Sequence, residues 1–445
     1  MLTIFSAQML ILDMPYTLHH GIQHNLAQFS QQLLQVFLVG LTLGLMRTVV
    51  PALAETEFGV AQGSFLMLTS FVVAFGVVKG VLNFVAGRLA EHIGRRRVLI
   101  LGWVAAIPVP LLIFWAPSWS WIVVATVLLG VNQGMCWSMT QTAKMDITRP
   151  QERGLTMGLN EFSGYVGVAL GGLLTGYIAI ALGPRFGLWL LGTTLICIAL
   201  LLAVFAVRET QPWAQAESTQ QAQNPMATSH LYAKLAEQPT TAQVFMLLSW
   251  RDRRMAAFSQ AGLVEKFVDA LVWVFYPVFL FQQGLNLAAI GWVVGVYGFV
   301  WGGAQLITGH LSDRWGRLKP IIWGMWLAGA GVALMLLGEG LVWWSFAAAL
   351  TGLGMALLYP NLSAAIADLS HPNWRSSAFG IYRFWRDLGY AIGALAFGWI
   401  AAITGTLSAG FWFVAIAMAL SGTLVMFWGE ETHPHLRRMK VKRTH

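Results

Sequence analysis

Apolar runs of about 20 residues recur along the chain, a length of helix that crosses the roughly 30 Å hydrocarbon core of a bilayer. Short polar stretches separate these runs. Strands of a membrane barrel would alternate apolar and polar residues, whereas these runs are apolar throughout. The pattern therefore predicts twelve transmembrane α-helices, at residues 33–54, 64–86, 98–115, 121–143, 157–182, 186–207, 258–281, 287–308, 320–338, 341–366, 377–404 and 408–429.

The composition supports this interpretation. Hydrophobic residues make up 57% of the 445 residues, charged residues only 10%, and the mean hydropathy is +0.64. Because soluble domains carry about 25% charged residues, the chain is predicted to be an all-α polytopic membrane protein. The two cysteines, Cys136 and Cys197, lie within apolar runs and indicate neither a disulfide framework nor a metal site.

One loop sequence occurs twice. Residues 87–97 read Gly-Arg-Leu-Ala-Glu-His-Ile-Gly-Arg-Arg-Arg, and residues 309–319, 222 positions later, read Gly-His-Leu-Ser-Asp-Arg-Trp-Gly-Arg-Leu-Lys. With this offset held fixed, eight of the twelve glycines between positions 87 and 176 fall on glycine again, where composition alone predicts about one. The chain is therefore predicted to be a duplication, with two pseudo-symmetric halves of six helices each.

Basic residues are concentrated on one side of the predicted helices. Of the 27 Lys and Arg residues, 21 fall in alternate loops or in the C-terminal tail, and the opposite loops hold only Arg185. The positive-inside rule then predicts that both termini are cytoplasmic. The net charge of +8 is explained by this topology and by contact with membrane lipid, and it does not indicate nucleic-acid binding.

The helices and the duplication divide the chain into five parts. The first 30 residues lack the basic region and cleavage site of a secretory signal, which predicts a short, weakly ordered tail. The segment between the halves has the Gln-, Ala- and Ser-rich composition of a flexible linker. The predicted parts are an N-terminal cytoplasmic tail (1–32), a six-helix bundle (33–207), a cytoplasmic linker (208–257), a second six-helix bundle (258–429) and a basic cytoplasmic tail (430–445).

Charged residues within the apolar runs are candidates for function. Arg47 and Lys79 lie deep in the first two helices, where a charge must face a partner or a water-filled cavity. The fixed offset pairs Arg47 with Asp269, and the depth of this pair favours a central cavity. In the fourth helix, Asn132 and Gln133 either bind substrate or hydrogen-bond to neighbouring helices.

A second pair of opposite charges lies nearer the helix ends. The offset pairs Glu161 with Arg383, which Arg386 and Asp387 follow. Glu161 and Arg383 lie one to two turns from the predicted cytoplasmic ends of their helices, close to the two repeated loops. Such a position favours a conformational latch between the halves over a substrate site.

The repeated loop resembles a motif of the major facilitator superfamily, Gly-x-x-x-Asp-Arg-x-Gly-Arg, most closely in the second copy at residues 309–317. The first copy has Glu91 and His92 at the Asp and Arg positions. The resemblance covers the membrane-embedded chain and implies alternating access, with Glu91 and Asp313 as latch residues and Arg383 and Glu161 as their partners. The latch residues implied in this way are Gly87, Glu91, Arg95, Glu161, Gly309, Asp313, Arg314, Arg317, Arg383 and Asp387.

These residues favour a secondary transporter for a small polar, anionic solute. Arg47 and Lys79 suggest the anion, and Asp269 and Glu161 suggest a coupled proton, because a carboxylate near apolar surface can bind one. The sequence contains no phosphate loop, metal-ligand motif or nucleophile elbow, so we expect no enzymatic activity, cofactor or metal. We expect a monomer in a bacterial-type cytoplasmic membrane.

Two alternatives stay open. The same fold can export hydrophobic or cationic compounds in exchange for protons, and the 21 Trp and 26 Phe residues could line such a cavity. Gly172 stands where drug exporters of the family have a proline in the fifth helix, which argues against this alternative. The other alternative is a sensor or scaffold with the fold but no transport cycle, for which intramembrane charges have no use.

Overall fold

The computed structural model describes residues 18–58, 65–222, 239–434 and 436, which contain helices and no strand. Eleven helices in this part of the chain are long and apolar enough to cross a membrane. A twelfth pass consists of shorter helical pieces between Arg253 and Gln282. The predicted all-α membrane fold with twelve helices in two halves is therefore confirmed.

The first half has six passes. Pro108 comes two residues after the end of the helix Arg95–Ala106 and has no N–H to donate, so the pass predicted at 98–115 is divided in two. The passes are α2 (Leu26–Thr56), α3 (Phe65–Ile93), α4 with α5 (Arg95–Ala106 and Pro108–Phe114), α6 (Trp119–Ile147), α7 (Arg153–Leu182) and α8 (Pro184–Phe205).

The second half repeats this order. Its first pass is interrupted by a π-helical turn just before Pro277, which also lacks an N–H. The passes are α12, η4 and α13 (Arg253–Ala270, Leu271–Phe275 and Tyr276–Gln282), α14 (Leu287–Trp315), α15 (Leu318–Leu337), α16 (Leu341–Leu369), α17 (Arg375–Thr404) and α18 (Leu407–Trp428).

Two segments are more structured than their polar composition predicts. The first helix, α2, begins at Leu26 rather than at 33. Gln28 in its first turn donates to the carbonyl of Arg208 at 3.2 Å and accepts from the N–H of Arg208 at 3.1 Å. Between the halves, residues Gln211–Ala222 form α9, and α11 (Thr241–Met246) and the π-helical η3 (Leu247–Arg251) follow. Part of the segment interpreted as a flexible linker is therefore helical.

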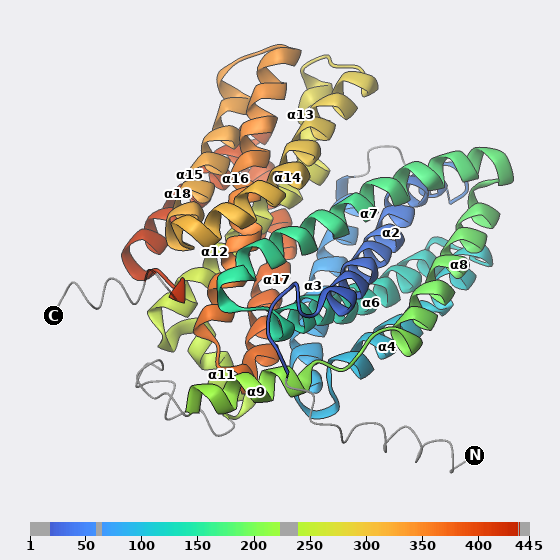
Figure 1. Ribbon diagram of the computed structural model, residues 1–445. Helices are drawn as coiled ribbons and strands as arrows, with labels where there is room; N and C mark the ends of the chain where they lie inside the picture. Colours follow the sequence, from blue (N-terminus) through green and yellow to red (C-terminus); the bar gives the residue numbers. More distant parts are fainter. Residues whose placement is uncertain (1–17, 59–64, 223–238, 435, 437–445) are drawn as a thin grey trace.

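The halves meet along two pairs of helices. Helix α3 of the first half packs along α17 of the second, and α14 of the second half packs along α7 of the first. These pairs are equivalent under the offset of 222 residues, as expected for a pseudo-two-fold arrangement. In Figure 1, α3 and α17 lie in the middle of the molecule, and α4, α8, α15 and α18 lie toward its periphery.

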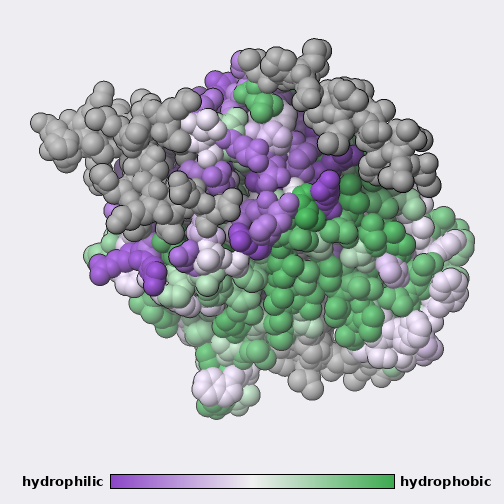
Figure 2. Space-filling view, turned by 90° about the horizontal axis from the view of Figure 1, so that it is seen from below, coloured by the Kyte–Doolittle hydropathy of each residue, from purple (hydrophilic) through white to green (hydrophobic). Residues whose placement is uncertain are grey.

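The outer surface suits a lipid environment. Large apolar side chains such as Ile180, Phe205 and Phe299 are more than four-fifths exposed, which would be costly in water. Figure 2 shows hydrophobic residues over a broad area and hydrophilic residues gathered in one region beside it. The loops between α3 and α4, α6 and α7, α14 and α15, and α16 and α17 lie at one end of the bundle, which we call the basic end.

Candidate functional site

A small cavity lies between the two halves, and side chains from both halves line it. It leaves about 10 Å³ for the centre of a water molecule, enough for about one water. Five aromatic side chains form part of the wall: Phe75, Trp137, Tyr165, Trp273 and Tyr390. Six charged side chains form the rest of its polar lining: Lys79, Glu161, Lys266, Arg383, Arg386 and Asp387.

Lys79 and Asp387 connect the halves across this cavity. Lys79 Nζ lies 3.8 Å from Asp387 Oδ2, and the amide of Asn83 donates a hydrogen bond of 2.6 Å to the same oxygen. The ammonium group also faces the rings of Phe75 and Trp137 at 5.4 Å. Lys79 thus lines the cavity.

Asp269 is enclosed by donors of its own half. Lys266 Nζ lies 2.6 Å from Oδ2. Three tyrosine hydroxyls also donate to the carboxylate, from Tyr297 at 2.8 Å, Tyr359 at 2.5 Å and Tyr390 at 3.2 Å. Both carboxylate oxygens are therefore satisfied, which holds Asp269 as a fixed counter-ion for Lys266.

Arg386 forms a second buried ion pair beside this cluster. Its Nε donates a hydrogen bond of 2.6 Å to Glu265 Oε1. The guanidinium lies 3.9 Å from the ring centroid of Tyr359, a cation–π contact that further stabilises the charge in an apolar surrounding. The ring of Tyr359 therefore contacts two of the basic side chains of this half, because Lys266 Nζ also lies 4.0 Å from its centroid.

Glu161 and Arg383 meet through an intervening amide. Gln141 donates a hydrogen bond of 2.5 Å to Glu161 Oε1, and its carbonyl oxygen accepts one of 2.6 Å from Arg383 Nη1. Both charged residues line the cavity. The structure therefore places both residues in the wall of the cavity and away from the two repeated loops.

The depth of these two residues was underestimated because α7 and α17 begin earlier than predicted. Glu161 and Arg383 each lie eight residues beyond the first residue of their helix, Arg153 and Arg375, which is about 12 Å along the axis. Asp387 lies one turn deeper. All three were predicted as latch residues, and all three line the cavity.

Arg47, Asn132 and Gln133 were also candidates for binding substrate or the coupling ion. Arg47 lies in α2 at a position whose side chain is outside the described residues. Asn132 donates to the carbonyl of Gly102 at 3.0 Å, and Gln133 donates to the carbonyl of Val39 at 2.9 Å. Both amides therefore hydrogen-bond to neighbouring helices, and neither lines the cavity.

The acids of the repeated loops contact the start of a helix in the opposite half. Asp313 accepts hydrogen bonds from the N–H groups of Gly154 at 2.9 Å and Leu155 at 2.8 Å, at the start of α7. Glu91 accepts a bond of 2.8 Å from the N–H of Ser377, at the start of α17. A carboxylate in this position satisfies free N–H groups and the positive end of the helix dipole.

The partners of these acids differ from those expected. In the described part of the chain, neither Glu91 nor Asp313 contacts Arg383 or Glu161, since both of these lie in the cavity. Instead, Glu91 pairs with Arg88 at 2.7 Å and Asp313 with Arg317 at 2.6 Å. Arg314 is exposed at the end of α14.

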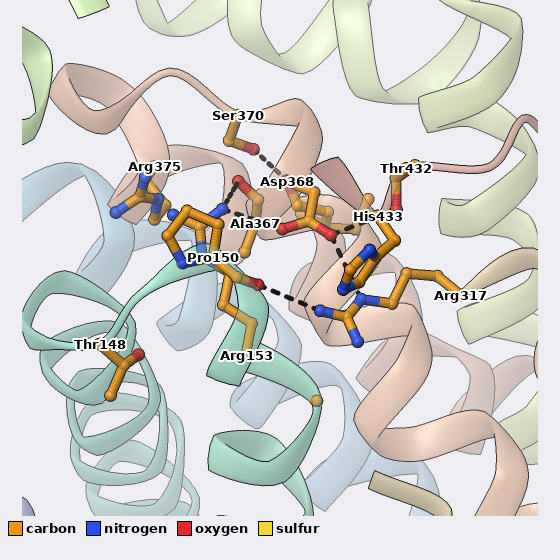
Figure 3. A network of polar contacts seen from close by, with 12 residues as sticks. Thr148, Pro150, Arg153, Arg317, Ala367, Asp368, Ser370, Arg375, Thr432 and His433 are labelled. Carbon is orange, nitrogen blue, oxygen red and sulfur yellow. Dashed lines mark hydrogen bonds and ion pairs between the residues drawn. The ribbon is translucent and has the colours of Figure 1, made fainter. Parts of the chain in front are cut away.

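Two further ion-pair chains close the basic end. Asp368 contacts Arg317 of its own half at 3.3 Å and Arg153 of the other half at 2.9 Å. Figure 3 shows both arginines reaching Asp368, with Arg317 also donating to the carbonyl of Pro150. The equivalent chain in the first half joins Asp146 to Arg95 at 2.9 Å and to Arg375 at 3.7 Å.

Helix α9 contributes one acid to both chains. Glu217 lies 3.0 Å from Arg153 Nη2 and 2.8 Å from Arg375 Nη2. Burial would raise the pKa of the Glu217 carboxyl, but Arg375 and Arg153 outweigh this effect and lower the pKa to about 2. The acid is therefore ionised at neutral pH and joins equivalent arginines of the two halves.

Glycines allow the helices to approach closely at this end. A Cβ on Gly309 would lie 2.6 Å from the carbonyl oxygen of Gly154, and one on Gly87 would lie 2.4 Å from that of Ser376. Real Cβ atoms essentially never approach backbone oxygens so closely. The glycines of the repeated loops are thus needed for the contact between the halves.

Several residues of these networks were not predicted as site residues. The offset did pair Asp146 with Asp368 and Arg153 with Arg375, and this symmetry is the signal that could have identified both chains. The tyrosines around Asp269 are scattered over three helices, so only the fold brings them together. Nothing in the composition of α9 distinguishes Glu217 from a solvated acid.

Two six-helix halves related by an internal repeat, with a charged cavity between them, are the architecture of a membrane transporter. The chain belongs to the Major Facilitator Superfamily, whose family model matches residues 33–264 and 261–443. Members of this family are transporters rather than enzymes, and the same holds for this chain.

Several known proteins are similar to the chain. It is 22% identical to an uncharacterized MFS-type transporter of Salmonella typhimurium over 435 residues, which cover 93% of the chain and 98% of the relative. Over 159 residues it is 31% identical to the multidrug resistance protein MdtH of Yersinia pestis, a match that covers 33% of the chain and 39% of MdtH.

Solved structures show the same fold. The human organic anion transporter TETRAN superposes with a TM-score of 0.73 at 17% identity, covering 90% of this chain and 99% of that chain. The proton:xylose symporter XylE also gives a TM-score of 0.73, at 15% identity, covering 93% of this chain and 99% of XylE. At these identities the likeness establishes the fold and not the substrate.

Proposed function

We propose that the protein is a secondary transporter that moves a small anionic solute by alternating access, with a proton as the coupling ion. The observation that carries the proposal is the set of four basic side chains lining one buried cavity between the halves, Lys79, Lys266, Arg383 and Arg386. Buried charges are costly in a membrane protein and are typical of substrate and ion pathways.

Access requires that contacts across the cavity break. Lys79 and Asp387 belong to different halves, and their charged groups lie 3.8 Å apart. Separation of the halves therefore removes the Asp387 carboxylate from the Lys79 ammonium group. An anionic substrate supplies the missing negative charge. This exchange of counter-ions gives the anion a role in the conformational change, because it stabilises the state in which the Lys79–Asp387 pair is open.

The basic end is proposed to face the cytoplasm of a bacterial cell, with both termini on that side, by the positive-inside rule. Contacts between the halves close this end, so the proposed state is closed to the cytoplasm. We propose a monomer surrounded by lipid as the working form. Arg47 remains a candidate ligand of the substrate because of its depth in α2.

The test is thermal-shift stabilisation of the purified protein by benzoate, lactate, glucuronate and citrate, because binding to the native state raises the apparent Tm. We expect at least one anion to stabilise the wild type and to lose its effect in Arg383→Gln. Lys319→Gln, which removes an exposed positive charge, is the matched control. Failure of every anion, or full stabilisation of Arg383→Gln, would contradict the proposal.

Export of lipophilic cations is the second candidate. Two observations support it: the aromatic wall of the cavity and the partial likeness to the multidrug resistance protein MdtH. Tetraphenylphosphonium and ethidium are therefore included in the same assay. Stabilisation by these cations alone, unchanged in Arg383→Gln, would favour export over anion transport.

A further inference from the structure

The four acids around the cavity differ in their counter-ions. Asp269 pairs with Lys266 at 2.6 Å, Glu265 with Arg386 at 2.6 Å, and Asp387 with Lys79 and Arg383 at 3.8 Å. Glu161 is only 1% exposed and has no ion pair among the described residues. It is thus the one acid of this group whose charge no basic side chain contacts directly.

Only one of the two carboxylate oxygens of Glu161 accepts hydrogen bonds from the described residues. Its Oε1 accepts bonds from three neutral groups, the indole of Trp137 at 3.1 Å, the amide of Gln141 at 2.5 Å and the amide of Asn160 at 2.8 Å. Its Oε2 is buried and accepts no hydrogen bond from the described residues, which also holds for Glu265 Oε2 and Asp387 Oδ1, although these two acids have ion pairs. The second oxygen is therefore available to hold a proton.

Protonation has opposite consequences at these sites. A buried charge without a counter-ion is costly, and a proton on Glu161 removes that cost. A proton on Asp269 or Glu265 would instead leave Lys266 or Arg386 as an uncompensated buried cation. The charge balance of the cavity thus favours Glu161 as the acid that gains and loses a proton.

Groups from several helices act on Glu161. Lys144 of α6, Tyr165 of α7 and Arg383 of α17 interact with it electrostatically, as do Tyr382 and Arg386 of α17. Lys144 donates to the carbonyl of Gln32 at 3.0 Å, and Arg383 is linked to Glu161 through Gln141. A change in the charge of Glu161 therefore acts directly on Arg383, a basic residue of the cavity lining.

We propose that Glu161 is the proton-carrying residue of the transport cycle and that it is protonated when the anionic substrate is bound. The inference rests on the proposed function. With all groups ionised, the four basic side chains that line the cavity are balanced by Glu161, Asp387, Asp269 and Glu265, and Lys144 lies outside this set. A proton on Glu161 leaves one excess positive charge, which one monovalent anion neutralises. The proton comes from water on one side and returns to water on the other, and only the O–H bond at Glu161 forms and breaks.

The first experiment needs no substrate. Infrared difference spectra of the purified protein between acidic and alkaline pH report the C=O stretch of each carboxyl group that titrates. We expect one such band to disappear in Glu161→Gln and to persist in Asp269→Asn and Glu265→Gln. Persistence of every band in Glu161→Gln would overturn the proposal, whatever the protein transports.

The second experiment separates exchange from proton-driven transport. Proteoliposomes are assayed with radiolabelled benzoate and glucuronate, both for counterflow and for accumulation driven by a pH gradient. We expect Glu161→Gln to keep counterflow within about threefold of the wild type and to lose accumulation, because a glutamine mimics a carboxyl that is always protonated. Ser163→Ala, on the same helix, is the control and retains both.

Two outcomes would separate the two proposals. If Glu161→Gln still accumulates either probe along the pH gradient, Glu161 is not the coupling residue. If wild-type protein transports neither probe and no anion stabilises it, the proposed function fails, and the infrared band decides independently whether Glu161 binds a proton.

Discussion

Arg153 and Arg375 occupy equivalent positions in the two halves, and both donate hydrogen bonds to the carboxylate of Glu217. Each arginine also contacts an aspartate of the opposite half, Arg153 with Asp368 and Arg375 with Asp146. Glu217 comes from α9, in the segment that connects the halves. The connecting segment thus holds the basic end closed.

Replacement of Glu217 by glutamine is expected to open the basic end more often. Loss of one partner of a buried ion pair costs about 3 kcal/mol or more, which corresponds to a roughly 100-fold shift in a conformational equilibrium. Ser376 is buried at this end, so maleimide labelling of Ser376→Cys, with Cys136 and Cys197 replaced by alanine, reports opening.

The control for this prediction is Gln220→Ala, an exposed position on the same helix. We expect its labelling rate to equal that of the parent protein. Equal rates for Glu217→Gln and the parent would mean that Glu217 does not hold the halves together.

Glu217 is expected to keep its effect throughout the physiological pH range. Its pKa in the closed state is about 2, below the ordinary value of 4.5. Because the closed state favours the ionised form, the stabilisation is complete above pH 4.5 and is lost as the pH falls toward 2. The difference in labelling rate between wild-type and Glu217→Gln backgrounds should therefore be constant from about pH 5 to pH 8, and a decline within this range would contradict the assignment.

Sequence patterns predicted the membrane spans well because a helix in lipid needs a long apolar segment. Within such a segment, charged residues are rare and are mostly functional. The duplication predicted which residues are equivalent, such as Glu161 and Arg383. It did not predict depth, because the first turns of α7 and α17 are polar and yet buried. Arg153 and Arg375 begin these helices, and their ion pairs across the halves compensate for the burial of their charges.

Side-chain partners could not be predicted for a different reason. Helices with apolar residues on all sides have no amphipathic pattern that fixes their rotation. The sequence favoured a cavity position for Asp269 and left Asn132 open between substrate binding and contact with a neighbouring helix. In the structure, only Asp269 has partners from the cavity lining. Glu217 was missed because a polar segment gives no sign of burial when its partners lie in other helices.

Gly309→Ala is expected to weaken closure of the basic end without unfolding the protein. The new methyl group would lie 2.6 Å from the carbonyl oxygen of Gly154 and 3.0 Å from the Cα of Gly158, and backbone atoms in packed helices cannot move aside. Overpacking of this kind costs about 1–3 kcal/mol. Because the strain exists only in the closed state, labelling of Ser376→Cys should accelerate.

Gly303→Ala is the matched control, since Gly303 lies on the same helix and its Cβ would meet no atom within 4 Å. We expect that variant to label at the parent rate and to keep the parent Tm. If Gly309→Ala behaves in the same way as Gly303→Ala, the close approach of α14 and α7 does not limit opening.

Asp269→Asn is expected to destabilise the fold, and not only to remove a carboxylate that could carry a proton. Lys266 lies 2.6 Å from Asp269 and is 1% exposed, and removal of one partner of a buried pair costs about 3–5 kcal/mol. Tyr297→Phe removes only one of the neutral donors and should cost about 1 kcal/mol. The apparent Tm in detergent should therefore fall much further in Asp269→Asn than in Tyr297→Phe.

A second substitution tests the cause of that loss. If the cost in Asp269→Asn arises from the uncompensated ammonium group, Lys266→Met should restore much of the lost Tm in the double variant, because a methionine needs no counter-ion. The two single variants would then be non-additive, as expected for residues in direct contact. Additive losses in the double variant would show instead that Asp269 stabilises the fold through its tyrosine partners, and the ion pair would be incidental.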